Sequence, residues 1–235
     1  MNTLPSTSLE LCQHGTHTYR AAAPSGEIVR LGPQEHSSFH WPTASRRQVL
    51  HVRISTYGWC WSGYFSPYVM DEFALRLRNQ HTHTIYLLRV IIKEEGPCTM
   101  IYFLPETPKV PPYRLENFSL ETLLVYQEGV REASQILLPY QTSSYAWDEP
   151  SRAPLRLVVE CNGRQLGSLE LDHIQVFVLD SSLFMQVVAD GPTRVLRVED
   201  ATLQSAAQSA SSRNMIKTMK LNMVSLKIGY DMTTK

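Results

Sequence analysis

The sequence predicts an all-β protein made of tandem antiparallel, sandwich-like modules, and three observations lead to this prediction. Runs with apolar residues at every second position dominate residues 28–198. Turn residues, chiefly glycine, proline and asparagine, separate these runs. A block of sequence also occurs twice, which is typical of repeated modules.

The expected strands follow from the alternating runs. In 47–55, Leu50, Val52 and Ile54 share one face of an extended chain. The run 84–92 is more continuously apolar, which is typical of a central strand. Further strands are expected at 73–79, 99–104, 123–127, 155–160, 168–180, 183–190 and 193–200.

The connections between these runs carry turn signals. Asn162-Gly163 stands between two runs and predicts a two-residue hairpin turn. Glycine followed by proline at 96–97 and 191–192 ends a strand, because glycine permits positive φ and proline lacks an N–H donor. Prolines within 105–112 exclude a central strand there and predict an extended linker.

The internal repeat consists of two similar sequence blocks that lie 106 residues apart. Residues 37–41 read Ser-Ser-Phe-His-Trp and residues 143–147 read Ser-Ser-Tyr-Ala-Trp. Alternating strands follow both blocks, and they align if one residue is skipped. Trp41 and Trp147 are therefore expected to be equivalent core residues of two β modules.

The expected organisation has four parts. Residues 1–27 are poorly ordered or a partial module start, 28–110 form an incomplete β module, and 111–199 form the last β module. Residues 200–235, rich in Ala, Ser and Gln at their start, are expected to be a linker and truncated tail, frayed or weakly helical.

Composition argues against several functional classes. A formal net charge of zero gives no basic surplus for nucleic-acid binding. The four cysteines have no metal or disulfide spacing, so reduced thiols are expected. The N-terminus does not resemble a signal peptide, and no apolar run approaches the ~20 residues of a membrane span, so a membrane role must be peripheral.

No motif for catalysis or cofactor binding stands out, so an enzyme is not expected. His81 and His83 share a strand face, but further zinc ligands are lacking and a solvated strand end is favoured. Asp148 and Glu149 are adjacent turn residues rather than an acid/base pair. We therefore expect no metal and no cofactor.

Trp59 and Trp61 fall on one face of an extended stretch that ends in Ser62-Gly63. The favoured interpretation is a core or inter-module seam. The alternative is an exposed aromatic anchor for a partner.

Four segments, in order, make the sequence recognisable. They are Trp-Ser-Gly at 61–63, Pro-Tyr-Arg-Leu-Glu-Asn at 112–117, Ser-Tyr-Ala-Trp-Asp-Glu-Pro at 144–150 and Asp-Gly-Pro-Thr-Arg-Val-Leu at 190–196. Together they resemble the adaptor-binding region of the vacuolar protein sorting 13 family, which are chorein-type bridge-like lipid transfer proteins. The resemblance covers roughly residues 28–199.

The resemblance implies a fold and a function. In that family the region is an array of six all-β modules, each with a signature asparagine, and it binds Pro-x-Pro motifs of organelle-specific adaptors. This chain resembles the end of the penultimate module and the last one. It also lacks the family's lipid-channel and C-terminal membrane-binding parts, so we expect a fragment or short isoform that does not transfer lipid alone.

Asn117 matches the signature asparagine and is expected to hold a loop rather than to touch a ligand, because a buried amide can bond several backbone groups. One repeat length earlier, residues 10–13 contain no asparagine, so the first module is expected to lack its signature. The residues expected to bind the adaptor or to organise the site are Tyr113, Arg114, Glu116, Asn117, Tyr145, Trp147 and Asp148.

Three functions stay open, in this order. The first is recognition of adaptor peptides at an exposed sheet edge beside an apolar groove near Asn117. The second is a structural spacer without a ligand, and the third is a peripheral lipid-binding module. In each case we expect a cytoplasmic protein, peripheral on an organelle membrane such as the Golgi or the endosome, with no nucleic-acid or small-molecule partner.

Overall fold

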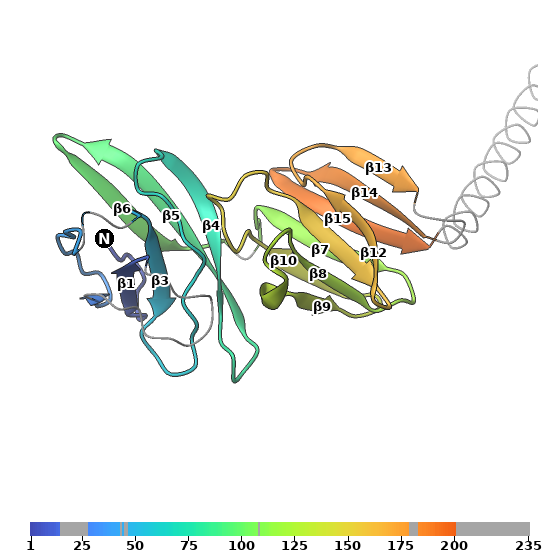
Figure 1. Ribbon diagram of the computed structural model, residues 1–235, viewed down its shortest axis with the longest axis horizontal. Helices are drawn as coiled ribbons and strands as arrows, with labels where there is room; N and C mark the ends of the chain where they lie inside the picture. Colours follow the sequence, from blue (N-terminus) through green and yellow to red (C-terminus); the bar gives the residue numbers. More distant parts are fainter. Residues whose placement is uncertain (15–27, 43, 45–46, 108, 179–182, 201–235) are drawn as a thin grey trace, which may run out of the picture.

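The computed structural model describes residues 1–14, 28–42, 44, 47–107, 109–178 and 183–200. Within them the chain is all-β, as predicted, with strands β1 to β15 and one short 3-10 helix, η1 (Arg131–Ala133). The strands form two bodies that lie end to end (Figure 1). We call β1 to β6 the first module and β7 to β15 the second module.

The first module packs two three-stranded sheets face to face. One has the order β2-β1-β3 and the other β4-β5-β6, and all these pairs are antiparallel. Alternating apolar side chains from both sheets, such as Leu9, Val52, Leu75 and Leu88, are fully buried between them. The strands are β1 (Leu9–Gln13), β2 (Ile28–Leu31), β3 (Leu50–Ile54), β4 (Asp71–Arg78), β5 (Ile85–Glu95) and β6 (Cys98–Pro105).

The second module packs a five-stranded sheet of order β10-β7-β15-β14-β13 on a four-stranded sheet of order β12-β11-β8-β9. β7 pairs parallel with β15, and the other pairs are antiparallel. The strands are β7 (Tyr113–Phe118), β8 (Leu123–Gln127), β9 (Gln135–Leu137), β10 (Thr142–Tyr145), β11 (Leu157–Cys161), β12 (Arg164–Leu169), β13 (Gln175–Val178), β14 (Leu183–Asp190) and β15 (Thr193–Asp200).

The predicted hairpin at Asn162-Gly163 is confirmed. Both residues have positive φ, 51° and 76°, and they connect β11 to β12 with Cys161 opposite Arg164. The single strand expected at 168–180 is wrong. The chain leaves β12 at Leu169 and turns, with Leu171 fully buried, before β13 begins at Gln175.

The first residues of the chain belong to the first module. β1 is the central strand of its sheet, all five of its residues are buried, and it pairs with both β2 and β3. Residues 15–27 and the expected tail at 201–235 lie outside the described residues. The module boundaries drawn from the sequence stay a prediction.

The two modules repeat the same strand pairings. Leu9 in β1 pairs with Leu31 and Ile54, and Leu123 in β8 pairs with Leu137 and Cys161. Strands β1, β2 and β3 therefore correspond to β8, β9 and β11. The difference in residue number between equivalent positions grows by one from the β2/β9 pair to the β3/β11 pair, as the skipped residue in the sequence repeat predicts.

Candidate functional site

A buried asparagine fixes one loop of the second module. Asn117 lies in β7, is 0% exposed, and its amide nitrogen donates to the carbonyl oxygens of Glu121, Leu137 and Leu138 at 2.7, 3.2 and 3.0 Å. Its amide oxygen accepts from the Ser119 N–H at 3.1 Å. One side chain thus joins the start of β8 to the turn after β9.

The first module contains the same arrangement around Asn2. Its amide nitrogen donates to the carbonyl oxygens of Thr7, Leu31 and Gly32 at 2.8, 3.2 and 2.8 Å. Its amide oxygen accepts from the Leu4 N–H at 3.0 Å. The expectation that the first module lacks its signature asparagine is therefore wrong.

The error has a simple cause. The repeat spacing of 106 holds for the loop carbonyls, Leu31 and Leu137, but Asn2 and Asn117 are 115 residues apart. The connection from β1 to β2 is longer than that from β8 to β9. A search that allowed an insertion between these strands would have found Asn2.

The two turns that follow these carbonyls also match. Gln34 and Tyr140 both adopt positive φ, 60° and 58°, although neither is glycine. Behind them, the Glu35 and Gln141 carbonyls accept from the N–H of Asn2 and Asn117 at 2.8 and 2.9 Å. A strained turn is thus reproduced at both sites.

The neighbours of Asn117 on β7 point to two sides of the sheet. Arg114 donates to Glu116 Oε1 at 2.7 Å and to Asp190 Oδ2 at 2.6 Å, and Arg197 donates to Glu116 Oε2 at 2.6 Å. Hydrogen bonds to Asp190 and Glu116 raise the pKa of the Arg114 guanidinium. This ion network ties β7 to β15 and to the β14–β15 turn.

Tyr113, Tyr145 and Trp147 form an aromatic cluster on the core side. Their ring centroids lie 5.4 to 6.5 Å apart in edge-to-face contacts, and Tyr145 and Trp147 are 0% and 4% exposed. Burial, with a hydrogen bond from Tyr113 Oη to Asp172 Oδ1 at 2.9 Å, raises the pKa of Tyr113 to about 12. The cluster belongs to the core, as the repeat predicted for Trp147.

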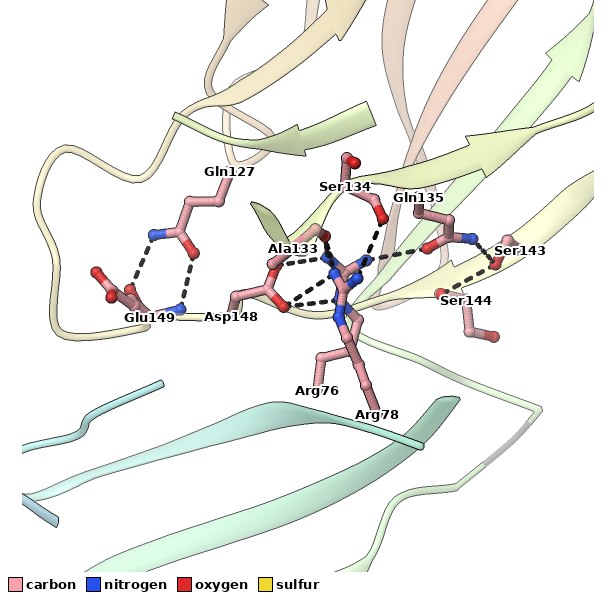
Figure 2. A network of polar contacts seen from close by, with 10 residues as sticks. All are labelled: Arg76, Arg78, Gln127, Ala133, Ser134, Gln135, Ser143, Ser144, Asp148 and Glu149. Atoms are coloured by element: carbon pink, nitrogen blue, oxygen red, sulfur yellow. Dashed lines mark hydrogen bonds and ion pairs between the residues drawn. The ribbon is translucent and has the colours of Figure 1, made fainter. Parts of the chain in front are cut away.

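A buried ion network joins the two modules (Figure 2). Asp148, 3% exposed, accepts from Arg76 Nε and from Arg78 Nη2, each at 3.1 Å, and Arg76 Nη2 binds its other oxygen. Arg76 also donates to Gln135 Oε1 at 2.9 Å and to the Ala133 carbonyl at 3.0 Å. Burial and the nearby charge of Arg76 lower the pKa of Arg78.

Glu149, next to Asp148, is held separately. The Gln127 amide donates to the Glu149 carbonyl at 2.9 Å and accepts from the Glu149 N–H at 2.8 Å (Figure 2). The two acidic residues therefore have different partners, as expected for turn residues. The sequence did not predict Arg76 and Arg78 as partners, because they lie some seventy residues away in another module.

Trp59 and Trp61 do not lie on a strand. Apart from a single bridge between Trp59 and Asn79, residues 59–64 form no ladder. Trp59 is half-buried and meets Tyr86 edge-on, and the Arg53 guanidinium lies 4.5 Å above the Trp61 ring. This placement fits a seam of the first module better than an exposed anchor.

A groove of about 520 Å³ opens in the first module between residues 36–41 and the start of β6. Its walls are largely apolar and include Val29, Phe39, Trp41, Tyr68, Ile101 and Phe103. β7 itself presents no free edge, because it pairs with β10 and β15, whereas β10 beside it is the last described strand on that side of the sheet. The groove lies in the other module, beside Asn2.

Neither a metal cluster nor a membrane-spanning helix occurs in the described part of the chain. In the described part of the chain no group of three or more His, Cys, Asp or Glu could hold a metal ion, and His81 stacks on Tyr57 at 4.7 Å. Cys12, Cys60 and Cys98 form no disulfide in the described part of the chain. No helix among the described residues is long and apolar enough to cross a bilayer.

Comparison with known proteins decides the family. The model of the vacuolar-sorting associated protein 13 adaptor-binding domain matches residues 1–154. The chain belongs to the vacuolar protein sorting 13 family. It carries the adaptor-binding domain of these lipid transfer proteins, and the match includes both asparagine loops and the inter-module network.

Curated relatives agree. The chain is 29% identical over 182 residues, 73% of its length, to intermembrane lipid transfer protein vps13A of Dictyostelium discoideum. It is 34% identical over 136 residues, 57% of its length, to VPS13D of Homo sapiens. It is 31% identical over 134 residues, 56% of its length, to vps13D of Dictyostelium discoideum. The matches span only 5%, 3% and 3% of these vacuolar protein sorting 13 proteins.

Proposed function

We propose that this chain recognises adaptor proteins by binding extended Pro-x-Pro peptides, and that it thereby directs a lipid transfer protein to an organelle membrane contact site. The match to the adaptor-binding domain over residues 1–154 carries the proposal. It supports protein partners, and we further propose a peripheral place on an organelle membrane such as the Golgi or the endosome. We propose no enzymatic activity and no cofactor.

The groove of the first module offers chemistry suited to such a peptide. Phe39 and Trp41 meet edge-to-face at 5.2 Å, and Trp41 stacks with Tyr68 at 6.2 Å. Proline-rich peptides dock in aromatic-lined grooves because their extended form is already populated, so little conformational entropy is lost. The expected site residues around Asn117 hold the second module in shape and do not offer free side chains to a peptide. Their part in the proposed function is therefore structural.

The test is a fluorescence-anisotropy titration of labelled Pro-x-Pro peptides against the purified chain. Alanine replaces both prolines in the control peptide. Saturable binding that the alanine peptide loses supports adaptor recognition. A folded chain that binds neither peptide contradicts it.

One observation favours a second function, that of a spacer. The buried contact of Arg76 and Arg78 with Asp148 fixes one module against the next. Such a joint suits a segment that holds other parts at a defined distance. Absence of peptide binding, together with cooperative unfolding of both modules, would favour this function.

A further inference from the structure

Two histidines of the first module form a hydrogen-bonded pair at the end of β1. His14 directly follows β1, and its Nδ1 lies 2.7 Å from Nε2 of His51 in β3. The two rings stack with their centroids 5.0 Å apart, and both residues are half-buried. The ladder between β1 and β3 ends beside them, at Gln13 and Leu50. The pair therefore holds the end of β1 against β3.

The hydrogen bonds of the pair assign its tautomers. Nδ1 of His51 lies 2.6 Å from the Ser62 carbonyl oxygen, which can only accept, so this nitrogen carries a hydrogen. Nε2 of a neutral His51 is then an acceptor, and Nδ1 of His14 donates to it. Both neutral histidines thus carry their hydrogen on Nδ1, which leaves Nε2 of His14 as the nitrogen that can take a further proton.

This arrangement distinguishes the first added proton from the second. The first can bind Nε2 of His14 and leaves the hydrogen bond to His51 intact. The second must bind Nε2 of His51, where it meets the N–H of His14 across 2.7 Å. Two donors and two positive charges then face each other, so the contact is lost. The pair therefore accepts one proton without breaking and breaks at the second.

Three other ionisable side chains act on the pair. The Tyr64 ring lies 5.6 Å from that of His14 and 6.5 Å from that of His51. The Arg47 guanidinium lies 4.3 Å from the centroid of Tyr64. The Glu149 carboxylate, 5% exposed, acts on both histidines from the second module. Burial lowers the pKa of both histidines, the charge of Arg47 lowers the pKa of His14 further, and the charge of Glu149 raises both.

The second module shows that the fold does not require these histidines. The strand pairings give the matching positions as Glu128 for His14, Val158 for His51 and Ser168 for Tyr64. There the Ser168 hydroxyl donates to Glu128 Oε2 at 2.9 Å, beside a buried valine. None of the three is a histidine, the side chain whose ordinary pKa lies nearest to neutral pH. The proton-sensitive pair is thus a feature of the first module and not of the shared fold.

We propose that the His14–His51 pair is a pH-sensitive latch of the first module, closed while it holds at most one added proton and open when it holds two. In the open state His14 leaves β3, and the hydrogen bond from its N–H to the Val49 carbonyl, 2.9 Å long, is lost. The first proton also places a positive charge near Glu149, across the boundary between the modules. The latch goes beyond the proposed adaptor recognition and does not depend on it.

The protonation of each ring can be read by long-range proton–nitrogen NMR of the full, isotope-labelled chain from about pH 8 to about pH 5. Single histidine-to-glutamine variants assign the signals. We expect His51 to carry its hydrogen on Nδ1 at the upper end of this range. Below pH 6.5 we expect two separate steps, with the first proton on His14.

Hydrogen exchange of the His14 amide, measured across the same titration, reports whether the latch is closed. Its protection factor should hold through the first step and fall about fivefold at the second, the effect of losing one hydrogen bond. Amides of β11 are the internal control, because this strand has Val158 in the place of His51. Their protection should not change at either step.

Three variants of the chain locate the effect. His14→Gln should abolish the fall in protection and leave His51 to titrate in one step, because glutamine takes no proton. Its matched control, His173→Gln, changes a histidine of the second module whose side chain is 72% exposed, and should leave both steps unchanged. Glu149→Gln should move the first step to lower pH, because the carboxylate that favours the cation is removed.

Circular dichroism checks at the upper pH that each variant is folded. A hydrogen on Nε2 of His51 at that pH overturns the proposal, as does a second step that leaves the His14 amide protected. An unchanged fall in protection in His14→Gln also overturns it. So does unfolding of the whole wild-type chain before the second step, because the pair then does not open within a folded module.

Discussion

Replacing Asp148 by asparagine should destabilise the chain strongly, because its carboxylate binds both the buried Arg76 and the half-buried Arg78. Arg76 is 2% exposed and its side chain cannot reach water without moving the modules apart. Asparagine keeps the shape and one acceptor but removes the negative charge that faces both guanidinium groups. Breaking a buried pair on one side costs about 3–5 kcal/mol.

The free energy of unfolding would be measured by urea titration, and the melting temperature by calorimetry. For a chain of this size each kcal/mol lowers the melting temperature by about 2–4 °C, so a loss of roughly 6–20 °C is expected. Asp148→Leu combined with Arg76→Met should recover only part of it, because this pair then carries no desolvated charge but Arg78 still lacks its carboxylate partner. The surface pair of Glu72 and Arg89 gives the control.

Glu72→Gln should cost at most about 1 kcal/mol, because both partners are well exposed to solvent. If Asp148→Asn cost no more than this control, the network would not be the buried joint between modules that we describe. Two separated unfolding steps in Asp148→Asn, against one in the wild type, would show that the network couples the modules.

Three further results are expected. Asn2→Ala and Asn117→Ala should each lower the free energy of unfolding in urea by roughly 2–4 kcal/mol, because carbonyls at matching sites lose their donor; a neutral Asn2→Ala would contradict their equivalence. Burial lowers the pKa of both His14 and His51 below the ordinary 6.5, so the stability that their neutral forms contribute is present above pH 6.5 and is lost as pH falls through the lowered values. His51→Gln should therefore flatten the loss of melting temperature on acidification, and an unchanged slope would refute this. Gly129→Ala should cost about 1–2 kcal/mol in a thermal melt, because φ is +79°; a cost near zero would contradict that backbone conformation.

The structure also separates residues that shape the domain from surfaces that can meet a partner. Asn117, Tyr145 and Trp147 are buried, so substituting them would change folding before binding. The open aromatic pair of Phe39 and Trp41 is the better target for binding studies. A variant there tests recognition with a smaller loss of core packing.

Much of the fold could be predicted from local patterns. A two-residue apolar period marks strands such as β3 and β14, because successive side chains point to opposite faces of a sheet. The turn at Asn162-Gly163 follows from the ease with which these residues take positive φ. The repeated aromatic-x-Trp block predicted two modules. A repeat can be found from the sequence alone, because it depends only on the order of residues along the chain.

Only the tertiary structure decided which distant groups meet. The sequence repeat did not reveal Asn2, because the connection between β1 and β2 is longer than its counterpart in the second module while the hydrogen bonds of the asparagine are the same. The contact of Arg76 with Asp148 could not be predicted, because in the sequence neither residue differs from an ordinary charged surface residue. Trp147 is buried in contact with Tyr113 of β7, whereas Trp41 is half-buried. The sequence by itself thus determined the strands, the turns, the repeat and the family. The ion network between the modules and the groove of the first module were decided only by the tertiary structure, because burial and contacts between distant residues depend on all elements at once.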